Sequence, residues 1–253
     1  MKKLILHIPH SSTTIPSLEG YINDKTKIEN EIIKLTDWYT DELFQSDYDE
    51  MIVTPFSRLF CDVERFQNDE DEIMSKVGMG ALYERFDDDE VLRTVTPLYR
   101  ENIIWDYYRE HHIRLAQVVS TQLDLYGSAL IIDCHSFPST PLLKAIKQSN
   151  NPPDFNIGTD PFHTPTELTE IAINYFNNLG YSCGLDWPYS GTIVPMKYYK
   201  KNKNVYSIML EVNRKLYLNE PTNEKSVEFE KIKKVIEGFL INLKVNYIYN
   251  RIK

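Results

Sequence analysis

Short apolar runs of strand length recur along the chain, and stretches with helical periodicity separate most of them. The runs cover residues 4–8, 51–53, 129–132 and 205–210, and weaker ones cover residues 155–157 and 181–184. Continuous apolar runs of this length are typical of strands buried on both faces of a sheet. Strands that alternate with helices predict a three-layer α/β/α sandwich with a mixed, largely parallel sheet.

Longer segments have the apolar periodicity of amphipathic helices. They cover residues 28–45, 96–127, 164–180 and 227–244. A threonine followed by a proline opens the second and third segments, and a glycine closes each of them, as is typical of helix ends. The sequence contains no internal repeat and no Gly/Ser-rich linker, so we expect one domain over residues 1–253.

Charge and composition exclude several classes of protein. The chain carries a formal net charge of −9, and no basic stripe offsets this total, which argues against a nucleic-acid partner. No segment approaches the ~20 apolar residues of a membrane span. The three cysteines form no CxxC pair, which favours a reducing compartment, so we expect a cytoplasmic protein. The oligomeric state stays open.

Polar side chains follow the apolar runs at several points. His10 follows the first run and His135 follows the run at residues 129–132, while Asp37 and Glu211 add two carboxylates. Ligands of α/β sheets gather at the carboxyl ends of strands, where we expect these side chains to meet. Two imidazoles and one carboxylate suit Zn²⁺, and a second carboxylate held off the metal would accept a proton from water.

Each of these residues also has a structural explanation. His10 could cap the following turn, and Asp37 could be a solvated acid within a helix. Asp133 could pair with His135 in the core, or could orient its ring toward a metal. Glu211 could neutralise an arginine one turn away. The spacing between these residues is too long for a local motif, so their convergence is a tertiary prediction.

Arginines form a second cluster, at Arg58, Arg65 and Arg214. An arginine fork holds a carboxylate through two parallel hydrogen bonds, which suits an acidic substrate. Arg58 could instead pair with Asp62 at helical spacing. The turn at residues 190–192 could hold an anion through its N–H groups and hydroxyls, or could be only a turn.

Short motifs stand in one order along the chain: HIPHSSTTIP, TDWYTDELF, SRLFCDVERF, DCHSFP, PYSGTIVP and EVNRKLY. Together they resemble the N-formylglutamate amidohydrolase family over residues 4–217. The resemblance implies a zinc-dependent hydrolase with a phosphorylase/hydrolase-like α/β fold, similar to zinc carboxypeptidases. The implied reaction is hydrolysis of N-formyl-L-glutamate to formate and L-glutamate.

The resemblance also implies roles for individual residues. His10 and His135 match the histidine ligands of Zn²⁺, and Asp37 resembles the carboxylate ligand, for which Asp62 is the second choice. Glu211 matches the catalytic base. The residues expected at the substrate are Arg58, as support for the oxyanion, and Arg65, Ser190, Gly191, Thr192, Asn213 and Arg214.

Several features leave the substrate less firmly implied than the metal. Glu64 stands where the commoner family motif, D-x-N-R, has asparagine, and Thr192 stands where many relatives carry glycine.

Residues 66–94 are polar and acidic, with glycines flanking Met79, and predict a flap over the site. The alternatives are a zinc amidase of another N-acyl amino acid or cell-wall amide, and a non-catalytic α/β protein that binds an acidic ligand.

Overall fold

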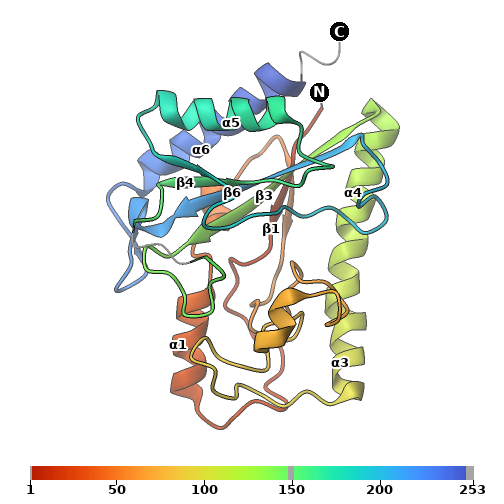
Figure 1. The fold of residues 1–253 in the computed structure, drawn as a ribbon, viewed down its shortest axis with the longest axis vertical. Coiled ribbons are helices and arrows are strands. Elements are labelled where there is room, and N and C mark those ends of the chain that lie inside the picture. Colours follow the sequence, from red (N-terminus) through yellow and green to blue (C-terminus); the bar gives the residue numbers. More distant parts are fainter. Residues whose placement is uncertain (1, 148–150, 249–253) are drawn as a thin grey trace.

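A six-stranded sheet forms the centre of the computed structural model, which describes residues 2–147 and 151–248 (Figure 1). The strands lie in the order β2-β1-β3-β6-β4-β5. β4 is antiparallel to β6, and the other neighbouring pairs are parallel, so the predicted mixed sheet is confirmed. The strands are β1 Ile5–Ile8, β2 Glu50–Val53, β3 Ala129–Phe137, β4 Phe155–Gly158, β5 Cys183–Leu185 and β6 Val205–Asn213.

Helices cover both faces of this sheet, as the sequence predicts. α5 and α6 lie together over one face, and α4 lies against the other (Figure 1). None of the helices in the described ranges combines the length and apolarity needed to cross a membrane. The helices are α1 Lys25–Leu35, α2 Thr40–Leu43, α3 Pro97–Ile103, α4 Glu110–Tyr126, α5 Thr166–Asn178 and α6 Phe229–Leu243, and the π-helical turn Ile104–Arg109 joins α3 to α4.

Short elements complete the fold. They are the 3-10 turns Ile73–Val77 and Arg214–Leu216, the π-helical turn Lys244–Ile248, and a small antiparallel ribbon of β7 Leu218–Asn219 and β8 Glu224–Lys225.

The two faces of the central strands differ in chemistry. Side chains alternate between the faces of a strand, and the face of β3 toward α5 and α6 presents Leu130, Ile132 and Cys134. The opposite face is apolar at the start of β3 but presents Asp133 and His135 toward its end. All of these side chains are buried, which explains why the run appears continuous in the sequence. The polar end of this face positions the functional site.

The predicted helix over residues 28–45 is wrong in its middle. α1 ends at Leu35 and α2 begins at Thr40, so Asp37 lies in a break between two helices and not on a helix. Thr36 leaves the helix in an extended conformation, with φ −73° and ψ 133°, and Tyr39 adopts a left-handed conformation with φ 58°. These two backbone conformations turn the chain away from the helical path.

The predicted flap at residues 66–94 packs against the site. Met74, Met79 and Tyr83 from this segment are buried and line a cavity beside it. They belong to a core cluster that includes Ile28 and Leu35 of α1. Opening of this segment stays a prediction.

Candidate metal centre

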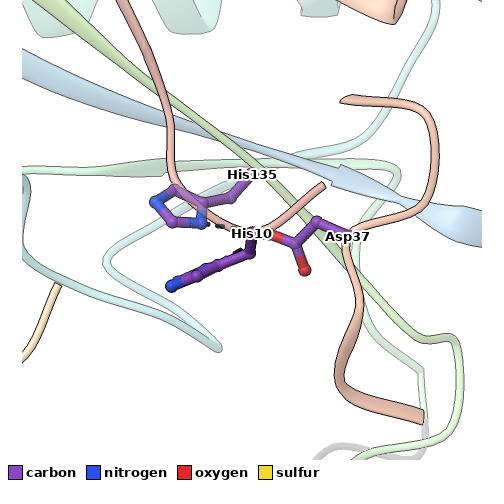
Figure 2. Close-up of side chains that lie close together, drawn as sticks. All are labelled: His10, Asp37 and His135. Atoms are coloured by element: carbon purple, nitrogen blue, oxygen red, sulfur yellow. Dashed lines mark hydrogen bonds and ion pairs between the residues drawn. The ribbon is translucent and has the colours of Figure 1, made fainter. Parts of the chain in front are cut away.

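Side chains from distant parts of the chain meet near the ends of β1 and β3 (Figure 2). His10 lies two residues beyond β1, Asp37 lies in the helix break, and His135 lies within β3. Asp37 Oδ2 is 3.1 Å from His135 Nδ1 and 3.6 Å from His10 Nδ1. The candidate ligand atoms of all three residues lie within 4.8 Å of one another. The structure thus brings together the three residues proposed from the sequence, while their role as metal ligands stays a prediction.

Backbone and arginine contacts hold Asp37 in place. Its backbone N–H donates to the carbonyl oxygen of His10 at 2.9 Å, which ties the helix break to the segment after β1. Arg214 Nη2 donates to Asp37 Oδ1 at 3.1 Å, and Nη1 donates to the carbonyl oxygen of Lys34 at 2.9 Å. The guanidinium therefore occupies one carboxylate oxygen and leaves Oδ2 facing the two imidazoles.

Both histidines are held through their far ring nitrogens. His10 Nε2 lies 2.9 Å from Asp62 Oδ1, and His135 Nε2 lies 3.1 Å from Asp133 Oδ1. These contacts direct both Nδ1 atoms toward Asp37. His10 Nδ1 is buried and has no hydrogen-bond partner among the described residues. Histidines that bind metal are typically held by a carboxylate in this way, so the residues fit a divalent ion.

The electrostatics of the site favour a cation between the carboxylates. Burial alone would raise the pKa of Asp37, but hydrogen bonds to His10 and His135 outweigh burial and hold this pKa well below its usual range. Burial would lower the pKa of His135, but Asp133 and Asp37 raise it well above its ordinary value. Positive charge is therefore stabilised where these side chains meet.

Asp62, the second choice for the carboxylate ligand, takes a different position. Its Oδ1 contacts the far nitrogen of His10, and its Oδ2 accepts hydrogen bonds from Arg58 Nη2 at 2.9 Å and from the Tyr83 hydroxyl at 2.7 Å. Asp62 therefore orients His10 and Arg58, which favours Asp37 as the ligand.

Asp62→Asn is expected to weaken metal affinity by about 10–100-fold, the usual effect of losing a group that orients a ligand. Competition with a chromophoric chelator measures this affinity. Asp69→Asn is the matched control, because Asp69 is a half-exposed carboxylate paired with Arg100 away from the site. Equal affinities for the two variants would contradict an orienting role for Asp62.

Glu211 lies beside His135, because the two are register partners in β6 and β3. Glu211 is buried and lines the cavity, and its Oε2 has no hydrogen-bond partner in the described part of the chain. Burial raises the pKa of Glu211 to about 8, although nearby His135 opposes this rise. Glu211 is not one of the three candidate metal ligands. With this raised pKa it can accept and release a proton near neutral pH.

Glu211 should make the stability of the metal-free protein depend on pH. Its pKa rises from 4.5 to about 8 on folding, so its contribution to stability is complete below pH 4.5 and is lost as the pH rises through 8. Glu211→Gln cannot ionise. Its free energy of unfolding, relative to the wild type, should therefore increase by a few kcal/mol from about pH 5 to about pH 9, at about 1.4 kcal/mol per unit of pKa difference. Urea unfolding with a chelator present measures this, and a difference that does not change with pH would contradict it.

A cavity of about 370 Å³ opens beside these residues, and the three predicted arginines line it. Arg58 and Arg214 are already paired, with Asp62 and Asp37 respectively. Arg65 Nε lies 3.5 Å from Asp62 Oδ2, but it is buried and makes no hydrogen bond within the described residues. Arg65 therefore keeps a buried donor that a substrate could use.

The predicted anion-binding turn contributes only partly to the cavity. Ser190 lines the cavity, but Gly191, Thr192 and Asn213 are not among its described lining residues. The Thr192 hydroxyl bonds to a serine of β6, and the Asn213 amide donates to the carbonyl oxygen of Pro153 at 2.9 Å. These contacts turn both side chains toward the protein interior.

Sequence reasoning named Glu64 only as a departure from the family motif, and it missed His7. Glu64 lines the cavity, and His7 Nδ1 lies 2.8 Å from Asp133 Oδ1, the oxygen that also contacts His135 Nε2. Strand alternation could have found His7, because it lies two residues after Ile5 and therefore on the face opposite to Leu6 and Ile8. The alternation of side chains along β1 was hidden in the sequence, because apolar residues occupy both faces of this strand.

The fold and the site define an α/β protein with a candidate metal centre at the carboxyl ends of its central strands. The sequence profile of the N-formylglutamate amidohydrolases matches residues 2–218, so the chain belongs to this family and the predicted resemblance is confirmed. No curated protein matches the chain.

Solved structures share the fold. The N-formylglutamate amidohydrolase from Ralstonia eutropha superposes with a TM-score of 0.84 at 20% identity, over 98% of this chain and 94% of that chain. A gene product from Agrobacterium tumefaciens superposes with a TM-score of 0.64 at 14% identity, over 96% of this chain and 92% of that chain. These likenesses support the three-layer α/β architecture.

Proposed function

We propose that the chain is a zinc-dependent amidohydrolase whose ion is held by His10, Asp37 and His135. The observation that carries this proposal is the buried His10 Nδ1, which lacks a hydrogen-bond partner among the described residues and faces Asp37 and His135. Nitrogen and carboxylate donors suit Zn²⁺, and three protein ligands leave a position open. When bound, the ion would polarise the amide carbonyl and increase the acidity of water.

Glu211 and Arg58 would carry the remaining chemistry. Glu211 would accept a proton from the attacking water and deliver it to the nitrogen of the leaving amino acid, so that one carboxylate serves first as base and then as acid. Arg58, held by Asp62 and Tyr83, would donate a hydrogen bond to the carbonyl oxygen as this oxygen becomes anionic.

N-formyl-L-glutamate is the substrate we propose, with formate and L-glutamate as products. Family membership supports this choice. Among the residues predicted to bind the substrate, Arg65, Ser190 and Arg214 line the cavity, and Arg65 retains a buried donor for a carboxylate. Hydrolysis of another N-acyl amino acid is the second candidate, because apolar residues such as Met74 and Phe137 line the same cavity.

Amine release from N-formyl-L-glutamate tests the proposed function. The protein is assayed as purified, after treatment with a chelator, and after Zn²⁺ is added back, and we expect activity to disappear and then return. A panel of N-acyl amino acids and a cell-wall amide identifies the preferred substrate. Binding of an acidic ligand without amine release from any compound would support the non-catalytic alternative instead.

We also propose that the protein is a single-domain cytoplasmic enzyme with residues 66–94 as its flap. All three cysteines are free in the structure, which supports a reducing compartment. The position of Met74, Met79 and Tyr83 at the cavity supports the flap.

A further inference from the structure

A second group of candidate metal ligands lies next to the first. His7, Glu64 and Asp133 each offer a ligand atom, and these atoms lie within 4.8 Å of one another. His7 Nδ1 is 2.8 Å from Asp133 Oδ1 and 3.1 Å from Glu64 Oε1. His7 and Asp133 are fully buried, and Glu64 is 16% exposed and lines the cavity. The group can therefore be reached through the cavity.

Hydrogen bonds account for only part of this group, because His7 Nδ1 lies at hydrogen-bond distance from Asp133 Oδ1 while Glu64 Oε1 is left without such a partner in the part of the chain that the structure describes. Glu64 Oε1 is buried and makes no hydrogen bond within the described residues, although His7 Nδ1 is 3.1 Å away. The first site also holds a buried polar atom without a hydrogen-bond partner among the described residues, His10 Nδ1, which lies 3.6 Å from Asp37 Oδ2. Buried polar atoms without partners require an explanation, and an ion bound at each of the two groups is one.

The far nitrogen of His7 is already occupied. His7 Nε2 lies 2.8 Å from His111 Nε2, and His111 Nδ1 lies 3.3 Å from the Thr54 hydroxyl. If His7 donates from Nε2 to His111, the lone pair of its Nδ1 faces two carboxylates. A cation placed between them would make this arrangement favourable. Metal-bound histidines are typically held by such a hydrogen bond from the other ring nitrogen.

The charge of the group also favours a cation. Among the described residues, neither Glu64 nor Asp133 forms an ion pair with a lysine or an arginine. Asp133 Oδ2 accepts one backbone hydrogen bond, from Ile193 at 2.9 Å. The other polar contacts that described residues make with the two carboxylates are with the imidazoles of His7 and His135, and Glu64 also lines the cavity. Buried carboxylates are costly unless a cation compensates them.

We propose that His7, Glu64 and Asp133 form a second site for a divalent transition-metal ion such as Zn²⁺. One imidazole and two carboxylates are a suitable donor set for such an ion. The site lies across the His135 ring from the first: His135 Nδ1 is 3.1 Å from Asp37 Oδ2, whereas His135 Nε2 is 3.1 Å from Asp133 Oδ1. The competing occupant is a proton, which would convert His7 into a cation between the two carboxylates.

Metal stoichiometry of the full-length protein distinguishes the ion from the proton. The protein is freed of metal, saturated with Zn²⁺, and analysed by elemental analysis and native mass spectrometry. We expect two equivalents in the wild type and one in Glu64→Gln. Glu211→Gln is the matched control, because it makes the same change on the same cavity wall, and it should retain two equivalents. Circular dichroism shows whether each variant is folded.

His10→Ala separates the second site from the first. One equivalent should remain in this variant, and none in His10→Ala combined with Glu64→Gln. One equivalent in the wild type and none in His10→Ala would overturn the second site while supporting the first. One equivalent in both of these proteins and none in Glu64→Gln would support the second site and contradict the first. If Glu64→Gln does not fold, the wild type and His10→Ala still decide.

Discussion

Replacement of Glu211 by glutamine is expected to reduce kcat for N-formyl-L-glutamate by roughly 10²–10⁴-fold, the usual contribution of a general acid–base residue. The amide has nearly the same shape as the carboxylate but cannot accept a proton from water. Glu211 lies outside the group of candidate ligands, so the variant should bind as much metal as the wild type. Steady-state kinetics and elemental analysis of the same preparation measure both quantities.

The control for this prediction is Glu170→Gln, which makes the same chemical change at an exposed position of α5, on the other face of the sheet. It should keep the kcat and the metal content of the wild type. Full activity of metal-loaded Glu211→Gln would exclude Glu211 as the base. Loss of metal together with activity would instead indicate that Glu211 contributes to the metal site.

Much of the fold could be predicted because buried strands leave a direct signal. The run at residues 129–132 predicted β3, although the strand continues to Phe137. Its end could not be placed, because the apolar pattern stops where the strand begins to present Asp133 and His135 to the site. The functional residues themselves interrupt the hydrophobic signal on which strand prediction depends.

The convergence of the site could be proposed from strand ends, but its details could not. Asp37 reaches the histidines through a helix break that contains neither glycine nor proline, the usual signals of a break. Asp37 and Asp62 contact opposite ring nitrogens of His10, at Nδ1 and Nε2. Sequence spacing does not distinguish these two positions, because the choice depends on the orientation of one imidazole ring in the folded protein.

His10→Ala is expected to remove one equivalent of bound metal and to abolish measurable hydrolysis. The substitution deletes His10 Nδ1, which is buried beside Asp37 and has no hydrogen-bond partner in the part of the chain that the structure describes. Losing a group that merely orients a ligand already weakens metal affinity by about 10–100-fold, so losing the ligand itself should weaken affinity by at least about 100-fold. Added Zn²⁺ at about 100 times the dissociation constant stabilises a protein by about 2.7 kcal/mol, and the part of this gain that comes from the first site should vanish in the variant.

His163→Ala provides the matched control, because His163 is as deeply buried as His10 but both of its ring nitrogens form hydrogen bonds with backbone groups. His163 Nδ1 lies 2.7 Å from the carbonyl oxygen of Val205, and Nε2 accepts a hydrogen bond from the backbone N–H of Lys200 at 2.8 Å. This variant should lose thermal stability and keep its metal. His10→Ala should show the opposite pattern, with metal lost while the protein is folded. If both variants kept full metal content, His10 would be a structural histidine, and the proposal of a zinc-dependent hydrolase would lose its central ligand.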